Sequence, residues 1–423
     1  MILKYGLLKY LGLGCSVIIG FLLPAVFSRN LSTEDFAMAT VVLGLSSYFS
    51  FFDFGVGKPA YSKIRKSFLN GDSEWKEDIY SIISFFIFSS FLVFFSFLFI
   101  TYFYIGKTYP YTNFFLFLFF SFFVSLNIFL NNMESVYNAV NKYFHFLIFD
   151  FLRKISPIII VVLIPVYNQL DVPYFFSTFF LLLLSVFSFF YFVRSDAIKI
   201  FHIKKHVRFV KKLWEDAFSY LFFNFSEAFI YNFGFILFPY FLLDVDMIVY
   251  GLWLKIFVGV NLFSVLAINV FIHKITELYH SNDFERTVKY LSCSFSLSLS
   301  ISLVSLSIFS IWENEILQRW ISDSKYTEGF PLAALWVWCV VNCIQSTCGV
   351  FLLSIGGNFV FLRKLALTTS GVMLLSVLYC SYHGFALYEI LLYASLVYAV
   401  GCIGYCVRLL MVFKRGGIYS EVS

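Results

Sequence analysis

The sequence predicts an all-α integral membrane protein that crosses the bilayer twelve times. Of its 423 residues, 60% are hydrophobic and only 13% are charged, whereas charged residues make up about 25% of soluble domains. Apolar runs of about 20 residues, the length of a transmembrane helix, recur along the whole chain. Basic residues also concentrate in alternate loops, which is typical of a multi-pass protein. A chain surrounded by lipid must satisfy its backbone hydrogen bonds internally, and helices do so.

Each apolar run is bounded by polar or charged residues, and these boundaries locate the spans. The predicted spans are 5–28, 36–57, 79–105, 112–136, 146–166, 173–193, 214–243, 247–270, 290–311, 329–355, 364–382 and 387–411.

The loop charges test this count. With both termini in the cytoplasm, 25 of the 30 Lys and Arg residues lie on the inner side, four lie on the outer side, and Lys255 lies within a span. An added or omitted helix would invert every later loop and remove this bias. The longest inner segment, 194–213, is basic and separates an N-terminal lobe (1–193) from a C-terminal lobe (214–423). Such a segment is typical of contact with anionic membrane lipids, so no nucleic-acid partner is expected.

Serines alternate with apolar residues between Ser292 and Ser302, which is the period of a strand. A lone strand cannot cross a bilayer, because its backbone groups would lack partners. We therefore expect a helix there, with serine hydroxyls bonded to carbonyls one turn earlier.

Two charges lie deep in the seventh and eighth spans. Glu227 is in the first of these, and Lys255 is nine residues past Asp246, or about 13 Å along a helix. A charge near the middle of an apolar layer about 30 Å thick indicates function by default. The alternative is a structural ion pair between neighbouring helices, and the sequence leaves both readings open.

Polar residues at helical spacing mark further candidate faces, which would line a cavity or bind helix to helix. Lys9 begins such a face in the first span, and Ser46 and Asp53 share one in the second. A pair between Glu134 and Arg153 near the inner surface is also possible. Asn127, Asn131, Asn138, Asp150, Asn224, Tyr231, Asn232 and Asn261 complete these polar positions.

Enzyme motifs and metal-ligand spacings are absent from the sequence. None of the eight cysteines forms a C-x-x-C pair, the six histidines lack ligand spacing, and no nucleotide-binding loop is found. We expect a protein that is not an enzyme and that has no cofactor and no bound metal. Any driving force would come from an ion gradient or from the substrate's own gradient.

Seven short segments carry a family resemblance: Tyr5–Leu8, Leu22–Pro24, Leu31–Phe36, Asp53–Gly57, Asn141–Phe144, Val249–Ile256 and Gly356–Phe359. They resemble segments of bacterial Wzx-type O-antigen and polysaccharide flippases, of the multidrug/oligosaccharidyl-lipid/polysaccharide exporter superfamily. With the whole of residues 1–66, which look like the start of such a flippase, they cover about a quarter of the chain, while the hydropathy layout matches over its full length. The resemblance implies two pseudo-symmetric six-helix lobes around a central cavity lined by spans one, two, seven and eight. It also implies alternating access by rocking of the lobes.

The substrate implied by the resemblance is an undecaprenyl-pyrophosphate-linked oligosaccharide, moved from the cytoplasmic to the periplasmic leaflet of the inner membrane. Other membrane proteins of polysaccharide assembly would be further partners. Basic groups could compensate the pyrophosphate charge, amides and hydroxyls could bind sugars, and carboxylates could carry a coupling H⁺ or Na⁺. The substrate-binding candidates are Lys255, Arg153, Lys9, Asn224, Asn232, Asn261 and Ser46, and the cation-coupling candidates are Glu227, Asp53 and Glu134.

Two other functions compete with lipid-linked oligosaccharide transport. A drug or metabolite exporter of the same superfamily would have the same fold and another cargo. A membrane glycan polymerase ranks below both, because such enzymes need large outer loops and the outer loops here are short.

Overall fold

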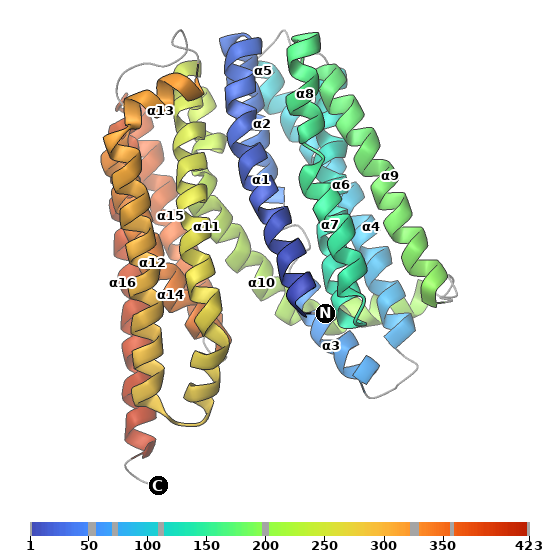
Figure 1. Ribbon diagram of the computed structural model, residues 1–423, viewed down its shortest axis with the longest axis vertical. Helices are drawn as coiled ribbons and strands as arrows, with labels where there is room; N and C mark the ends of the chain where they lie inside the picture. Colours follow the sequence, from blue (N-terminus) through green and yellow to red (C-terminus); the bar gives the residue numbers. More distant parts are fainter. Residues whose placement is uncertain are drawn as a thin grey trace. The chain divides into compact units, whose positions relative to one another are not determined.

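The computed structural model describes residues 2–49, 56–69, 75–108, 114–196, 203–321, 330–355 and 359–420. Within these ranges the regular elements are all helices, and no strand occurs (Figure 1). The predicted all-α class is therefore confirmed. The chain forms two compact units, 1–228 and 229–423, which divide within one long helix. The predicted lobe boundaries and the symmetry between the lobes stay predictions.

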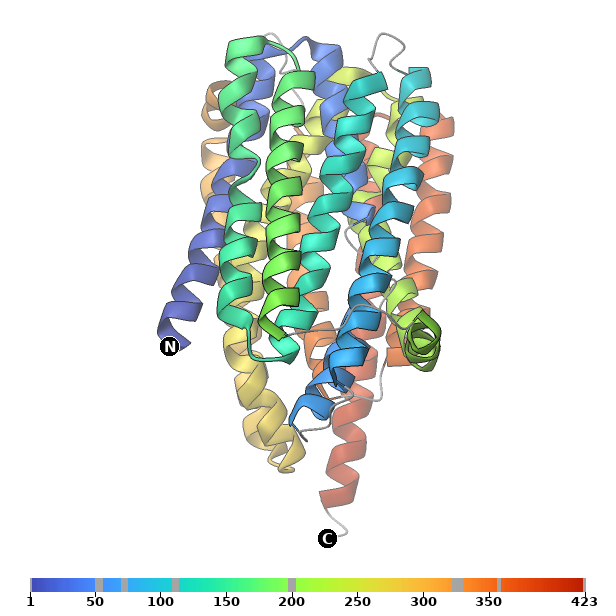
Figure 2. The same ribbon diagram turned by 90° about the vertical axis from the view of Figure 1, so that its right-hand side faces the viewer.

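The first unit is built around α6, which packs against α3, α4, α7 and α9, while α1 packs against α7 and α8. Figure 2 shows α4, α6 and α9 side by side. The helices of this unit are α1 (Ile2–Asn30), α2 (Thr33–Phe49), α3 (Gly57–Leu69), α4 (Trp75–Ile100), the π-helical turn η1 (Thr101–Ile105), α5 (Gly106–Thr108), α6 (Phe114–Ala139), α7 (Tyr143–Ile155), α8 (Ile158–Tyr167), α9 (Asp171–Asp196) and most of α10 (Ile203–Leu237).

In the second unit α14 is central and packs against α11, α12, α15 and α16. The unit contains the end of α10, η2 (Phe238–Tyr240), α11 (Asp244–His280), α12 (Phe284–Ile311), α13 (Glu313–Trp320), α14 (Leu332–Ser354), α15 (Phe359–Tyr382) and α16 (Leu387–Ser420).

The predicted spans correspond to helices of the structure. Nine helical segments of the described chain are long and apolar enough to cross a membrane, from Trp75–Ile105 to Leu387–Lys414. The first span matches α1, whose apolar stretch Gly14–Asn30 is shorter, and the second matches the 17-residue α2. The fifth span is divided between α7 and α8. The layout agrees with a membrane protein of about twelve helices.

Local sequence explains where several helices begin. At the start of α2, the Ser32 hydroxyl accepts the Asp35 N–H at 3.0 Å and donates to the Asp35 carboxylate at 2.7 Å. This N-cap gives the Asp35 N–H the hydrogen-bond partner that the first turn of a helix does not provide. Phe27 and Phe36 meet edge to face across the turn. Between α6 and α7, Asn141 adopts a left-handed conformation (φ 61°), which asparagine tolerates well.

The serine-rich segment forms a helix, α12, as predicted, but the expected back-bonding is wrong. Ser294, Ser298 and Ser302 recur every four residues and are buried. The Ser302 hydroxyl bonds to that of Ser264 at 2.5 Å, and the Ser264 hydroxyl also donates to the Ser298 carbonyl at 3.4 Å. The serines form a small-residue face that lets α11 approach α12 closely, and the buried hydroxyls of Ser294 and Ser298 have no hydrogen-bond partner among the described residues.

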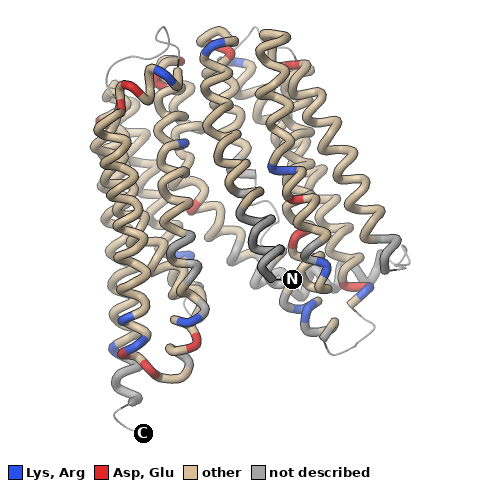
Figure 3. Tube along the Cα trace, in the orientation of Figure 1, with Lys and Arg blue, Asp and Glu red and all other residues tan. Residues whose placement is uncertain are grey.

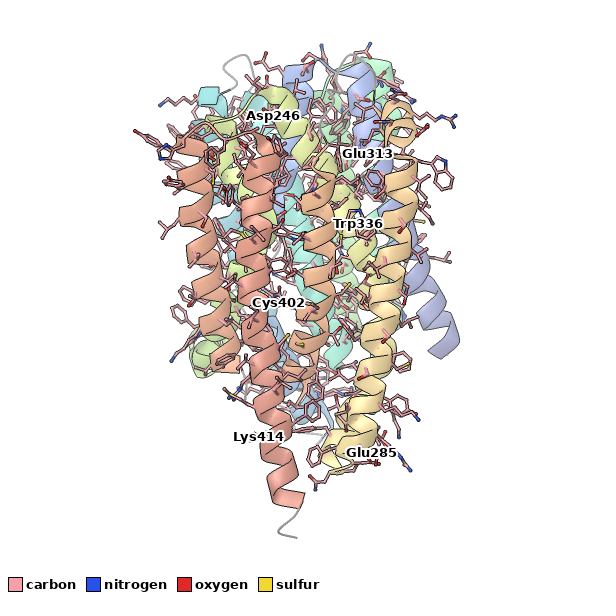
Figure 4. All side chains as sticks on the ribbon, turned by 90° about the vertical axis from the view of Figure 1, so that its left-hand side faces the viewer. Asp246, Glu285, Glu313, Trp336, Cys402 and Lys414 are labelled. Atoms are coloured by element: carbon pink, nitrogen blue, oxygen red, sulfur yellow. The ribbon has the colours of Figure 1, made fainter. Side chains whose placement is uncertain are left out.

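Charged residues lie mainly toward the helix ends, and the middle stretches are mostly uncharged (Figure 3). In the second unit, Asp246 and Glu313 lie at one end, while Glu285 and Lys414 lie at the other (Figure 4). The loop charges predict these same groupings on opposite sides of a membrane.

Candidate functional site

Three charged side chains meet on α7 in the first unit. Asp150 is buried and accepts from Arg153 Nη2 at 2.5 Å and from Arg153 Nε at 3.2 Å. Its second oxygen lies 2.6 Å from Lys154 Nζ. The Asn131 side chain, on α6, accepts from Arg153 Nη2 at 3.5 Å. We call Asp150, Arg153 and Lys154 the charged triad, and its net charge is +1 with all groups ionised.

The triad lies next to a helix break within the predicted fifth span, 146–166. α7 ends at Ile155 and α8 begins at Ile158, with Pro157 between them. Because proline has no N–H, the helix cannot continue through it undisturbed. The Ser177 hydroxyl donates to the Ser156 carbonyl at 3.3 Å and satisfies a group at the break. Arg153 lies seven residues past the predicted start of the fifth span at residue 146, or about 10 Å along a helix, so the charges lie in the inner half of this predicted span.

The helix end and a neighbouring helix position the triad. Cations at the last turn of a helix are stabilised by its exposed carbonyl groups, and both cations occupy the last turn of α7. On α1, a Cβ atom at Gly12 would lie 3.4 Å from Phe151 and 3.6 Å from Lys154. α1 therefore passes close beside the triad.

The triad retains capacity to bind an anion. Asp150 compensates only one of two positive charges, and the Arg153 Nη1 group bonds to none of the side chains that the structure describes. A guanidinium and an ammonium held together form charge-assisted hydrogen bonds with phosphate oxygens. The triad thus holds one uncompensated cation inside an apolar span.

In the second unit, Lys255 occupies the middle of α11. It is half-buried and lies eleven residues past Asp244, or about 17 Å along the helix. The ion pairs described within this unit join Lys274 to Glu277 and Arg286 to Asp283, and Lys255 takes part in neither. Glu227 belongs to the first unit and Lys255 to the second, so the choice between a functional pair and a structural ion pair stays open.

A neutral polar cluster ties four helices of the second unit together. The hydroxyls of Tyr231 (α10) and Tyr398 (α16) lie 3.0 and 3.1 Å from the Asn342 side-chain oxygen on α14. The Asn342 amide donates to the Asn261 side chain on α11, and the Ser346 hydroxyl donates to the Asn342 carbonyl.

The Asn342 oxygen is saturated, because its two acceptor positions are filled by the two hydroxyls. Trp338 packs against Tyr398 with ring centroids 4.9 Å apart, and Phe257 stacks on Tyr231 at 5.7 Å. A saturated polar cluster between aromatic rings fixes helix positions. Asn261, predicted as a sugar-binding residue, is therefore engaged in holding α11 to α14.

The remaining predicted residues are scattered. The Ser46 hydroxyl donates to the Leu43 carbonyl of its own helix at 2.6 Å, and the contacts of Arg153 are with Asp150 and Asn131 rather than with Glu134. Asn232 is buried, whereas Asn224, Glu227 and Glu134 are half-buried. The Lys9 side chain and all of Asp53 lie outside the described residues.

Several contributing residues were not among the predicted site residues. Asp150 and Lys154 belong to this group, although their spacing of one turn inside an apolar run was a visible signal. Asn342 and Tyr398 lack such a signal, because single polar residues in apolar runs are common. Only the packing of α14 against α16 and α10 brings them together.

Solved structures with a similar fold include several membrane transporters. One is an inward-facing multidrug resistance MATE family transporter of the MOP superfamily, with a TM-score of 0.69 and 12% identity over 96% of both chains. The chain has the fold of the MATE family transporters. The MATE multidrug transporter DinF-BH matches with a TM-score of 0.60 and 16% identity over 96% of both chains.

A third similar structure is a MOP superfamily transporter from Pyrococcus furiosus, for which a reversed polarity of the binding pocket suggests a different function. It matches with a TM-score of 0.57 and 12% identity over 99% of this chain and 95% of that chain. No protein-family model and no curated protein matches the sequence. At these identities the similarity establishes the fold alone, and the named structures that share it are those of transporters.

Proposed function

We propose that this protein is an alternating-access transporter that moves an undecaprenyl-pyrophosphate-linked oligosaccharide from the cytoplasmic to the periplasmic leaflet. The observation that carries the proposal is the charged triad, with its net charge of +1 at a helix break within a span. A pyrophosphate cannot cross hydrocarbon unless its charge is compensated. Broken helices are typical of the sites at which transporters bind charged substrates.

Each unit offers one basic site for the pyrophosphate in this proposal. In the first unit it is Arg153 with Lys154, and in the second it is Lys255, which is half-buried within α11. Each charged hydrogen bond contributes about 1.5–3 kcal/mol. Loss of one such bond would therefore weaken binding by about tenfold or more.

Reconstituted vesicles provide the test. Transport of a fluorescent pyrophosphate-linked lipid oligosaccharide is measured by its accessibility at the far leaflet. We expect Lys255→Ala and Arg153→Ala to reduce the rate by about tenfold or more, with Lys255→Arg partly active. Lys274→Ala is the matched control, because Lys274 is exposed and paired with Glu277. Full transport by the Lys255→Ala and Arg153→Ala proteins would contradict the proposal.

Glu227 is the proposed site for a coupling H⁺ or Na⁺, since a carboxylate within a span is expensive unless it has such a role. We expect Glu227→Gln to slow transport while expression stays normal. Unchanged transport by this variant under an imposed ion gradient would show that Glu227 is not the coupling group.

A second candidate is export of drugs or metabolites, which is favoured by the similarity in fold to two multidrug transporters. Cationic drugs would require acidic binding residues, whereas the triad has excess positive charge. The same vesicles, loaded with a cationic dye, separate the two functions. Dye export without movement of the lipid-linked oligosaccharide would establish the second.

The proposal includes a topology in the inner membrane with both termini in the cytoplasm. The placement of Asp246 and Glu313 at one end of the second unit and of Glu285 and Lys414 at the other supports it (Figure 4). Other membrane proteins of polysaccharide assembly would then receive the product on the outer side.

A further inference from the structure

A groove of about 310 Å³ runs between α4, α6 and α9 of the first unit. Figure 2 shows these three helices side by side, with α6 in the middle. Phe129 and Ser125 of α6 are buried residues of its lining, and Phe91 of α4 and Phe190 of α9 are exposed ones. The groove is distinct from the charged triad, whose cations belong to α7.

The lining is suited to hydrocarbon. Its serine hydroxyls bond to carbonyls of their own helices: Ser90 to Phe86 at 2.8 Å, Ser125 to Phe122 at 3.0 Å and Ser185 to Leu181 at 2.8 Å. Such internal bonds remove the polar character that a hydroxyl would otherwise present. The volume lies at the lower end of ligand sites, so the groove accepts a segment of one chain rather than a whole lipid.

Basic and aromatic groups lie near the C-terminal end of α9. Ser185, Phe189 and Phe192 follow one face of this helix, and the first two line the groove. The Lys142 ammonium lies 5.2 Å from the ring centroid of Phe192, which is one helical turn beyond Phe189. The His145 ring is 5.1 Å from that of Tyr191. Tyrosine and lysine at this position are typical of the headgroup level of a membrane.

A hydrocarbon groove with a cation about one helical turn beyond its lining complements an anionic lipid. We propose that the groove between α4, α6 and α9 binds one chain of an anionic phospholipid, whose phosphate lies at Lys142. Basic groups at the cytoplasmic side of membrane helices bind such headgroups, with about 1 kcal/mol per Lys or Arg near the surface. A zwitterionic lipid with the same chains would gain less from Lys142.

Native mass spectrometry of the full-length protein in detergent tests this site. Phosphatidylglycerol and phosphatidylcholine with identical chains are titrated separately. We expect phosphatidylglycerol to bind about fivefold more tightly, the factor that corresponds to about 1 kcal/mol. Lys142→Ala should remove this preference, while Lys107→Ala should retain it. Equal binding of both lipids by the unmodified protein would overturn the assignment of the headgroup.

Two further variants test the groove itself. Ser90→Leu fills it from α4, and Phe190→Ala removes part of one wall. Each has a matched control elsewhere: Ser370→Leu, since Ser370 makes a similar bond to its own helix, and Phe187→Ala, since Phe187 is an equally exposed neighbour. We expect both groove variants to weaken phosphatidylglycerol binding and both controls to leave it unchanged. Equal affinities of groove variants and controls for phosphatidylglycerol would overturn the proposal. Binding of polyprenyl pyrophosphate without binding of phosphatidylglycerol would also overturn it.

Discussion

Asp150 shows how a membrane protein accommodates a buried carboxylate. It is buried, yet its two oxygens contact the cations of Arg153 and Lys154 at 2.5 and 2.6 Å. An unpaired charge at this depth would cost several kcal/mol. With two cations present, loss of either one leaves Asp150 paired.

The two cations should therefore be partly redundant for stability. We expect Arg153→Ala alone to lower the free energy of unfolding by about 1–2 kcal/mol. Arg153→Ala combined with Lys154→Ala should lower it by about 3–5 kcal/mol, the cost of an uncompensated buried charge. Denaturant unfolding in detergent measures both. A double variant that loses no more than the sum of two small single effects would contradict this coupling.

Burial shifts the pKa of Glu313 upward, whereas a nearby cation shifts the pKa of a paired carboxyl downward. It lies at the start of α13, outside the membrane spans, and burial raises the pKa of its carboxyl above the ordinary value of 4.5. The folded state then binds the proton more tightly than the unfolded state. The protonated Glu313 carboxyl therefore contributes to the free energy of unfolding. This contribution is fully present below about pH 4.5 and is lost as the pH rises through the folded-state pKa.

We expect Glu313→Gln to remove this part of the pH dependence. The melting temperature of the variant should exceed that of the unmodified protein by more at about pH 7 than at about pH 4.5. Melting curves in detergent across that range provide the measurement. Glu315→Gln, on the same short helix, is the control. Parallel pH profiles for Glu313→Gln and the unmodified protein would show that burial of Glu313 does not matter.

At the scale of elements, small residues set the spacing between helices. On α16, a Cβ atom at Gly401 would lie 2.5 and 2.7 Å from the side-chain atoms of the buried Thr369 on α15. No atom lies within 4 Å of a Cβ built at Gly371. Close packing between α15 and α16 therefore requires a glycine at position 401, whereas position 371 has room for a larger side chain.

The alanine variants of these glycines should change stability with opposite sign. Gly401→Ala forces α15 and α16 apart and should cost about 1–3 kcal/mol. Gly371→Ala meets open space and should stabilise its helix by about 0.5–1 kcal/mol, because glycine loses more chain entropy on folding. Thermal unfolding of the two variants side by side is the measurement. Destabilisation by Gly371→Ala equal to that by Gly401→Ala would contradict the packing argument.

At the scale of the whole molecule, the arrangement of charges makes the topology testable. Lys107 is one of four basic residues predicted on the outer side, and Lys274 is one of those on the inner side. We expect a cysteine replacing Lys107 to react with an impermeant maleimide in intact cells. A cysteine replacing Lys274 should react only after permeabilisation. Both variants would be made without the eight native cysteines, and the reverse pattern would invert the topology.

The sequence by itself determined the fold class and the approximate places of most membrane spans. Hydropathy and loop charge are local properties that the bilayer imposes on every span. Arg153 and Lys154, counted with the inner side, lie within the predicted span 146–166, and the structure pairs both with Asp150. Their spacing in the sequence did not show that both cations contact one carboxylate.

Only the tertiary structure decided which polar residues meet. Tyr231, Asn342 and Tyr398 come from three helices that are distant in the chain, and their hydrogen bonds saturate one amide. The Ser302 hydroxyl bonds to side chains of α11 and α14 instead of making the expected back-bond, and the buried hydroxyls of Ser294 and Ser298 have no partner among the described residues. The physical reason is that apolar helices carry little information about their neighbours. Which faces pack together depends on shape and small residues across several helices at once.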